Sequence, residues 1–344
     1  MAKSDIGYFA VDCGKYNTKA AYVTDNAVER FKFRTKISPG TFDDDMFGKG
    51  SFIVQVDDGP VFKVGSEGKT EPVLETSKKS EVHRVCTMAA IGSMCGITGM
   101  QEVNIAIGIP LQLCENPEER IAYKDYILGK EGESHTVRIK TSPDEEVKEI
   151  TFRFAKRYVY PEGIGVIYEY PSRLSGPTAI IDIGNLNINN SYVDRFNINA
   201  ESCFTDELGG KILISELAET LTTELGSRVD ENLVASLLLR PYESRELVPR
   251  SGDRAVADKS RQIIDRYLID HVTKIKRKCD TRHWPLNFMD VVCVGGTSKL
   301  LARELKIVFG EDTFIPQDPE YTNVMGFLKR MCASLNIDLP QKEA

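Results

Sequence analysis

The chain lacks the patterns typical of metal-binding, disulfide-bonded or membrane-spanning proteins. No two of its eight cysteines form a C-x-x-C pair, and its four histidines show no metal-ligand spacing. The longest apolar runs, such as residues 291–295, are strand-sized and far shorter than the roughly 20 residues of a transmembrane helix. The first residues run straight into a strand-like segment, with no signal-peptide pattern. We therefore expect buried, reduced thiols and a cytoplasmic protein.

An excess of basic residues is also missing. The 344 residues include 44 Lys and Arg against 51 Asp and Glu, which gives a formal net charge of −7. Phosphate neutralisation needs a basic surface, so this balance disfavours a protein that coats DNA by itself. The basic cluster of Lys274, Lys276, Arg277 and Lys278 falls at the C-terminal end of a predicted helix, where the helix dipole favours cations, and we interpret it as a solvated helix end.

The length suggests roughly two domains, and apolar β-prone segments alternate with helical patterns along the chain. Strands are predicted over residues 6–12, 18–23, 28–33, 52–56, 61–64, 103–109 and 157–160, with a charged hairpin over residues 137–154. Helices are predicted over residues 77–95, 208–225, 231–239, 254–279 and 323–335, with a further helix beginning at Pro117. This mixture indicates an α/β fold.

The opening pattern returns in the second half of the chain. An apolar strand ends in Asp182-Ile183-Gly184, 170 residues after a strand that ends in Asp12-Cys13-Gly14. Further strands are predicted over residues 191–196 and 198–203, and a last strand over 291–294 leads into a helix of roughly ten residues. Two similar α/β halves that face each other are the economical interpretation.

Three motifs carry candidate chemistry. In the hairpin from Asp12 to Lys19, backbone N–H groups can point at an anion, glycine lets a phosphate approach, and the lysine adds a point charge. Asp12 could hold a hydrated Mg²⁺; a plain hairpin with an Asx turn is the alternative. The second motif, residues 182–187, repeats the strand and the Asp-x-Gly turn, and two such copies can grip a polyphosphate from both sides.

The third motif is a glycine pair between a buried strand and a helix. In residues 291–298, Gly295 and Gly296 allow backbone to approach a base, or a phosphate at the helix N-terminus. No Walker sequence G-x-x-x-x-G-K-[ST] occurs in the chain.

These three motifs, in this order, resemble those of the actin/Hsp70/sugar-kinase superfamily, and within it those of the bacterial actin-like plasmid-segregation ATPases, the ParM family. Residues 12–19 and 182–187 resemble the two phosphate loops, and residues 291–298 resemble the adenosine motif. Residues 103–110 and 323–327 resemble the two interdomain connectors. Residues 78–87 also resemble this branch.

The resemblance implies an actin-like (ribonuclease H-like) fold with two similar α/β domains around a nucleotide cleft. The first domain would comprise residues 1–165 plus 325–344, and the second residues 166–324. It also implies a head-to-tail filament, because a heterologous contact that does not close generates an open helix.

The resemblance also implies roles for individual residues. Asp12 and Asp182 would orient Mg²⁺ through its waters, and Lys19 would contact the β- and γ-phosphates. Glu162 would position the attacking water, an exposed turn carboxylate being the alternative. Further nucleotide contacts are implied for the hairpins and for glycine-rich helix starts: Gly14, Lys15, Tyr16, Asn17, Gly184, Asn185, Gly209, Gly210, Lys211, Gly295, Gly296 and Thr297.

Two positions depart from the family pattern. Lys15 stands where many relatives carry a hydroxyl or small residue, and would place an extra cation near the γ-phosphate. Asn185-Leu186-Asn187 replaces a run rich in glycine and threonine, and a leucine there restricts close approach and positive φ. The sequence leaves the geometry of this second loop, and its effect on hydrolysis, open.

The implied function is an ATPase, or alternatively a GTPase, that polymerises with Mg²⁺ and nucleotide to segregate plasmid DNA. A ParR-like adaptor on a centromere-like site would bind the DNA, and the chain itself would bind neither nucleic acid nor membrane. The loop of residues 42–47 mixes apolar and acidic groups and is a candidate subunit contact, with ordinary packing as the alternative. We interpret His83 as a packed or surface residue rather than a catalyst.

Two other functions of the superfamily are alternatives to this one. A small-molecule kinase of the sugar-kinase type would need a second pocket with a substrate-activating aspartate, and the sequence shows no such constellation. A monomeric nucleotide-dependent chaperone is disfavoured because no substrate-binding segment follows the candidate ATPase region.

Overall fold

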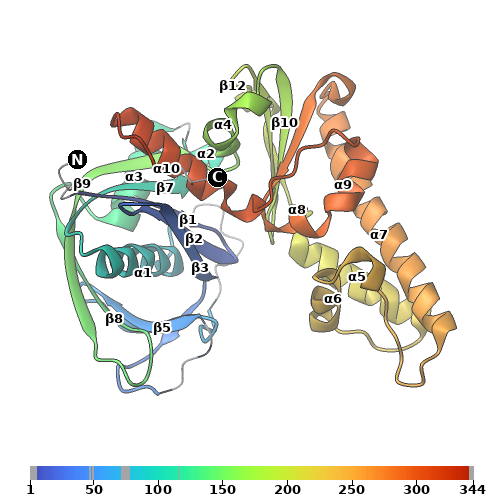
Figure 1. Cartoon of the computed structure of the whole chain (residues 1–344), viewed down its shortest axis with the longest axis horizontal. Helices are drawn as coiled ribbons and strands as arrows, with labels where there is room; N and C mark the ends of the chain where they lie inside the picture. Colours follow the sequence, from blue (N-terminus) through green and yellow to red (C-terminus); the bar gives the residue numbers. More distant parts are fainter. Residues whose placement is uncertain (1–5, 46–47, 49, 71–77, 115, 341–344) are drawn as a thin grey trace. The chain divides into compact units, whose positions relative to one another are not determined.

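A computed structural model describes residues 6–45, 48, 50–70, 78–114 and 116–340 (Figure 1). The chain divides into two compact units, described one after the other below. Unit 1 consists of Met1–Glu169 and Asn323–Ala344, and unit 2 of Tyr170–Thr322. Residues 46 and 47 of the candidate contact loop, and residue 77 at the start of a predicted helix, lie outside the described residues.

Unit 1 is built on a single large sheet. Its strands are β1 (Ile6–Cys13), β2 (Asn17–Val23), β3 (Val28–Arg34), β4 (Ile37–Pro39), β5 (Ser51–Val56), β6 (Val61–Gly65), β7 (Glu102–Ile109), β8 (Ser134–Lys140) and β9 (Lys148–Pro161). The order in the sheet is β3-β2-β1-β7-β9-β8-β5-β6-β4. β1 pairs antiparallel with β2 and parallel with β7, which in turn pairs parallel with β9. Because β1 and β7 are covered on both faces, they consist of nearly continuous apolar residues.

Helices cover both faces of this sheet. They are α1 (Glu81–Thr98), α2 (Leu111–Cys114), α3 (Pro117–Leu128), α4 (Val166–Glu169) and α10 (Thr322–Ser334). α1 contacts β1 and β2 as well as β5 and β8, so the sheet curves around it, and it also packs on α3 (Figure 1). Successive residues of a strand point to opposite faces. Arg157 of β9 pairs with Asp125 of α3, whereas Tyr160 contacts Phe327 of α10, which places α10 on the face opposite α3.

Unit 2 contains a smaller sheet. Its strands are β10 (Pro177–Ile183), β11 (Ile188–Asp194), β12 (Asn197–Ile198), β13 (Phe204–Asp206) and β14 (Asp290–Val294), and its helices are α5 (Gly210–Leu225), α6 (Glu231–Leu238), α7 (Arg254–Thr281), α8 (Gly296–Leu300) and α9 (Ala302–Phe309). The order in the sheet is β12-β11-β10-β14, and β13 also pairs with β11. Leucines of α5 and α6 and isoleucines of α7 form one buried cluster with β10 and β14.

Short 3-10 turns complete the fold. They span Pro171–Arg173, Ala200–Ser202, Tyr242–Ser244, Leu286–Phe288 and Pro319–Tyr321. Within the part of the chain that the structure describes, no helix is both long and apolar enough to cross a membrane.

The two units repeat one strand arrangement, which confirms the predicted α/β fold of two similar halves. In each, the first strand pairs antiparallel with the next strand and parallel with a later one: β1 with β2 and β7, β10 with β11 and β14. The paired residues of the two hairpins are also 170 positions apart in the sequence. Asp12 lies opposite Lys19 in unit 1, and Asp182 lies opposite Asn189 in unit 2.

Three expectations about the local structure were wrong. Residues 198–203 do not form one strand, because the side chain of Asn199 accepts a hydrogen bond from the Ser202 amide and stabilises a 3-10 turn instead. The helix after Gly295 is divided into α8 and α9 at Leu301, which is fully buried. Residues 103–110 are no connector, since β7 is a central strand of unit 1 and the chain passes between the units at Glu169–Tyr170.

Candidate functional site

The first predicted loop is a four-residue hairpin at the end of β1. The Gly14 amide donates to the carbonyl of Asn17 over 3.1 Å and closes the turn. Thr35, after β3, supports the turn from behind by donating its hydroxyl to the Gly14 carbonyl over 2.7 Å. At the tip, the guanidinium of Arg34 stacks on the half-exposed ring of Tyr16, with its carbon 3.1 Å from the ring centre. The hairpin is therefore held rigidly by its own sheet.

Asp12 and Lys19 face each other across this hairpin. The Lys19 ammonium lies 2.9 Å from the Asp12 carboxylate, and the Asp12 side chain is almost completely buried. Lys15 and Asn17 are half-buried at the turn itself. The first loop thus places one buried carboxylate and one partly accessible ammonium side by side, which suits a metal-bound phosphate.

Glu162 lies in the turn that follows β9, but its side chain is mostly buried and not exposed to solvent as the alternative supposed. Its amide donates to the Ile109 carbonyl over 2.8 Å and extends the ladder between β7 and β9 by one residue. Its side chain is 12% exposed and forms an ion pair with Lys78, which is itself buried. Lys78 also donates to the Cys13 carbonyl over 3.0 Å and so links Glu162 to the first hairpin.

Lys78 is the residue of this site that sequence reasoning missed. Burial alone lowers the pKa of its ammonium, but the carboxylates of Glu162 and Asp12 outweigh that effect and raise the pKa above the ordinary lysine value. Its position in a segment that resembles the ParM branch was the available signal. Nothing in that segment indicates which carboxylate the lysine contacts, because the two residues are 84 positions apart.

His83 packs behind the first hairpin, as expected for a structural residue. Its ring is 1% exposed, its Nδ1 lies 2.8 Å from the Ser80 hydroxyl, and its carbonyl accepts a hydrogen bond from the Cys13 thiol. Burial, with smaller contributions from the cations of Lys78 and Lys15, lowers the pKa of His83 to about 3. His83 is therefore neutral near pH 7. Burial also raises the pKa of the Cys13 thiol, so neither group provides a nucleophile.

The second predicted loop closes in the same way as the first. The Gly184 amide donates to the Asn187 carbonyl over 2.9 Å, and none of residues 184–187, all of which the structure describes, has a positive φ. Leu186 therefore fits this turn without backbone strain, which answers the question about the backbone geometry of this loop. One difference remains, because Asn189 stands where Lys19 stands in unit 1, and its side-chain oxygen accepts a hydrogen bond from Thr205.

The helix start at Gly209 packs directly on this second hairpin. The amides of Gly210 and Lys211 donate to the carbonyls of Gly184 and Asn185 over 3.0 Å and 2.6 Å. A Cβ on Gly209 would come within 2.5 Å of the Leu186 carbonyl carbon, so only glycine fits. The side chain of Lys211 is exposed, whereas the two amides are engaged by the hairpin.

The glycine pair after β14 meets the same hairpin. Gly295 has φ +85°, and a Cβ there would come within 2.4 Å of the Asp182 carboxylate. Thr297 donates its hydroxyl to the Gly184 carbonyl over 2.9 Å, and a Cβ on Gly210 would lie 2.6 Å from that hydroxyl. Unit 2 therefore brings together all of its predicted site segments, which are residues 182–187, 209–211 and 295–297.

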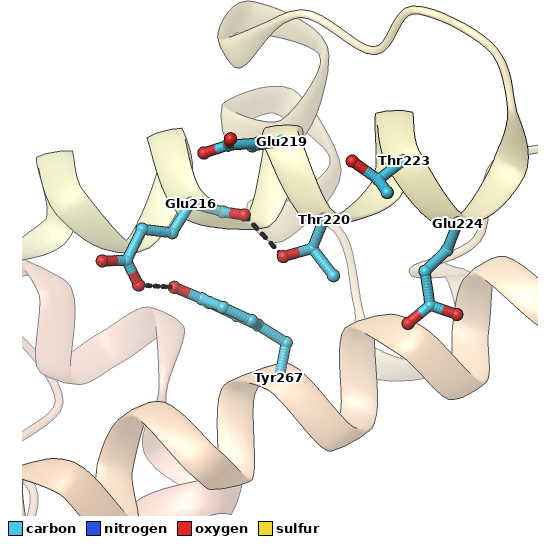
Figure 2. A pocket seen from close by; sticks show the side chains of 6 residues that line it. All are labelled: Glu216, Glu219, Thr220, Thr223, Glu224 and Tyr267. Carbon is cyan, nitrogen blue, oxygen red and sulfur yellow. Dashed lines mark hydrogen bonds between the residues drawn. The ribbon is translucent and has the colours of Figure 1, made fainter.

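A hollow of unit 2 lies away from these predicted residues. Figure 2 shows it between α5 and α7, with a volume of about 470 Å³ and a lining of Glu216, Glu219, Thr220, Thr223, Glu224 and Tyr267. Burial, and a 2.6 Å hydrogen bond that Tyr267 donates to Glu216, raise the pKa of this tyrosine. The predicted residues of unit 2 meet at the start of α5, whereas this hollow follows the middle and end of that helix.

Comparisons with known proteins place this geometry in a recognised fold. Residues 10–165 match the family model for the N-terminal domain of actin-like proteins. The chain is actin-like in its N-terminal domain and in its fold. The resemblance inferred from the motifs is thereby confirmed at the level of the actin-like fold. No curated protein matches this actin-like chain by sequence.

Solved structures of actin relatives cover this actin-like chain almost completely. The archaeal actin homologue Ta0583 matches 96% of this chain and 100% of its own length, with 19% identity and a TM-score of 0.74. The Alp12 filament structure matches 96% of this chain and 100% of its own length, with 21% identity and a TM-score of 0.69. ParM of Bacillus thuringiensis, solved with ATP, matches 97% of this chain and 100% of its own length, with 16% identity and a TM-score of 0.67. Identities this low show a shared fold, and the function is argued from the site.

Proposed function

We propose that this actin-like chain is a Mg²⁺-dependent ATPase that polymerises into filaments and segregates plasmid DNA. The observation that carries the proposal is the pair of equivalent hairpins, each closed by a glycine amide and each preceded by a buried aspartate. Phosphoryl transfer needs mainly positioning and charge neutralisation, and turns of this type supply both.

Unit 1 would bind the terminal phosphates and assist their hydrolysis. Lys19 would neutralise β- and γ-phosphate charge, Lys15 would add a second cation at the turn, and Gly14, Tyr16 and Asn17 would line the approach. Glu162 is held at the end of β9 on the side of the Cys13 carbonyl, because Lys78 contacts both groups. It would accept a hydrogen bond from the attacking water and orient it.

Unit 2 would bind the remainder of the nucleotide. Asp182, Gly184 and Asn185 would form the second phosphate contact. Gly209, Gly210 and Lys211 would lie at the ribose, and Gly295, Gly296 and Thr297 at the base. The exposed ammonium of Lys211 is the group of the ribose segment that is available to a ligand, since the amides of Gly210 and Lys211 already bond the hairpin.

Each hairpin offers one carboxylate, a donor that suits Mg²⁺. Mg²⁺ keeps several waters and takes one or two carboxylates together with substrate phosphates rather than a closed protein cage. Among the described residues no group of three or more His, Cys, Asp or Glu side chains could hold a metal by itself. Asp12 and Asp182 are single buried carboxylates, which suits contacts through water. When bound, the ion would supply neutralisation of phosphate charge.

Structures of relatives support the nucleotide and the filament. One neighbour is a ParM solved with ATP, another is a ParM solved with ADP, and a third is a filament of Alp12. We therefore propose ATP and ADP as the ligands, with GTP and GDP as the alternative, and a second copy of this chain as the assembly partner. A ParR-like DNA-binding adaptor on a plasmid site would connect the filament to DNA, which fits the net charge of −7 of the chain itself.

Light scattering of the purified chain at micromolar concentration tests the proposal. Scattering should rise on addition of Mg-ATP or Mg-GTP and fall as nucleotide is hydrolysed, and electron microscopy should show fibres at the maximum. Flat scattering across a range of salt concentrations, with no fibres, would overturn the filament proposal. Turnover that requires an added sugar, again without fibres, would instead indicate the small-molecule kinase.

Substitution of the phosphate-site lysine tests the first hairpin. Lys19→Met should weaken Mg-ATP binding by about tenfold to a hundredfold, the usual effect of losing one hydrogen bond to a charged group. Lys63→Met is the matched control, because Lys63 forms a similar ion pair with Asp44 in the same unit, 3.3 Å long. Titration with a fluorescent ATP analogue measures both affinities. Equal affinities for the two variants would remove Lys19 from the nucleotide site.

A further inference from the structure

Lys78 occupies an energetically costly position. Its side chain is 5% exposed, and its backbone is left-handed, with φ +52°, a conformation that residues with a Cβ rarely adopt. A buried ion pair is also a weak source of stability, because desolvation of the two charges offsets their attraction. Stability alone therefore gives no account of a buried lysine at this place.

The contacts of Lys78 join two strands that are not neighbours. Its ammonium donates to the Cys13 carbonyl at the end of β1 and to the Glu162 carboxylate just after β9, while β7 lies between these two strands in the sheet. The adjacent Lys79 differs sharply, since it forms a more exposed pair with Glu119 over 2.7 Å. Of these two lysines, Lys78 is the one that bridges the first hairpin and Glu162.

Packing limits the other positions that Glu162 can take. Its amide is fixed to the Ile109 carbonyl, and its Cγ lies so close to Gly108 that a Cβ there would approach within 3.3 Å. Tyr123 donates its hydroxyl to the Gly108 carbonyl over 3.0 Å and fixes the backbone at this point. The carboxylate therefore has its methylene chain against β7 and its charged end on Lys78.

We propose that Lys78 is a positioning residue for Glu162, which holds the carboxylate at a fixed distance from the first hairpin, so that the attacking water is bound in line with the terminal phosphate. The proposal rests on the hydrolytic function proposed above and deepens it. Lys78 would act through Glu162 and would contact neither nucleotide nor water itself.

The experiment is a double-mutant cycle on the full chain. Lys78→Asn removes the ammonium and keeps a residue that tolerates the left-handed backbone. We expect its kcat for Mg-ATP hydrolysis to fall about tenfold or more, with nucleotide affinity within about twofold of the wild type. In a Glu162→Gln background, the same substitution should change kcat by less than about twofold, because a residue that acts only through Glu162 has nothing further to lose. Lys79→Met is the matched control and should behave as the wild type.

Each outcome decides between the possibilities. A further loss of kcat in the double variant, compared with Glu162→Gln alone, would overturn the proposal, since Lys78 would then act independently of Glu162. A loss of nucleotide affinity without a loss of kcat would overturn it as well, and would make Lys78 a ligand contact. Lys78→Asn alone leaves the carboxylate of Glu162 without its ion-pair partner and could fail to fold for that reason. Glu162→Gln and the double variant have no carboxylate at position 162, so the comparison of their kcat values still tests whether Lys78 acts independently of Glu162. A wild-type chain without any nucleotide turnover would refute the proposed function itself, a result distinct from turnover that is insensitive to Lys78.

Discussion

Glu162→Gln is expected to slow hydrolysis of Mg-ATP by about a hundredfold or more and to leave nucleotide affinity within about twofold. The amide keeps the size of the side chain and can still accept a hydrogen bond from Lys78, but it lacks the negative charge of the carboxylate and should bind and orient the attacking water less strongly. The effect should therefore fall on the chemical step alone. Phosphate release after a single addition of nucleotide, and titration of a fluorescent analogue, measure the two quantities separately.

Two comparisons make this result specific. Glu119→Gln removes a carboxylate that also pairs with a lysine of unit 1, but at a more exposed position, and should hydrolyse ATP at the wild-type rate. Because hydrolysis would reverse assembly, Glu162→Gln should also form filaments that persist after the wild type has disassembled. Wild-type turnover in Glu162→Gln would exclude this residue from the mechanism and return the hydrolytic role to other groups.

The pH dependence of stability should depend strongly on His83. Burial, together with the cations of Lys78 and Lys15, lowers its pKa from 6.5 to about 3 in the folded chain. Between these two values the unfolded chain binds a proton that the folded chain does not, so the free energy of unfolding falls as the pH decreases through this window. By pH 4 this one residue should account for a loss of about 3 kcal/mol. Burial lowers the pKa of His271 too, which adds a loss of the same sign in unit 2.

Urea unfolding at pH 7 and at pH 4.5 measures this effect. In His83→Gln the difference in unfolding free energy between the two pH values should shrink by about 2 to 3 kcal/mol relative to the wild type. His283→Asn is the matched control, because His283 is exposed and asparagine tolerates its positive φ of 58°. Far-UV circular dichroism is the suitable probe, since the single tryptophan, Trp284, lies in unit 2. If the free energy of unfolding depends on pH in the same way in the wild type and in His83→Gln, His83 has the same pKa in the folded and the unfolded chain, and the prediction is wrong.

Local patterns were sufficient for most elements near the site. The run from Ile6 to Cys13 is apolar at nearly every position because β1 is covered on both faces, and such runs are recognisable without a partner strand. Pro117 predicted the start of α3, and in the structure the side chain of the preceding Asn116 accepts hydrogen bonds from the amides of Glu118 and Glu119. The apolar pattern was misleading where a side chain competes with the hydrogen bonds between strands. The side chain of Asn199 accepts from the Ser202 amide, and the strand predicted over residues 198–203 does not form.

Contacts across long sequence separations were not predictable in the same way. Gly295 was expected to face a ligand, and its lack of a Cβ also makes room for the Asp182 carboxylate. The role of Gly209 as a close contact of the second hairpin likewise follows only from its packing against Leu186. Leu186 was expected to restrict the second loop, yet the turn closes as the first one does because no residue in it needs a positive φ.

The sequence by itself determined the α/β class and the repeat of Asp12 at Asp182, because both depend on short segments whose residue types follow from local physical demands. Tertiary structure alone decided that Lys78 reaches Glu162 and that His83 is held neutral. It also decided that Asn189 lies opposite Asp182, at the position that Lys19 has opposite Asp12 in the first hairpin. These properties depend on burial and on the distance between charges, which are set by how strands and helices pack and not by spacing along the chain.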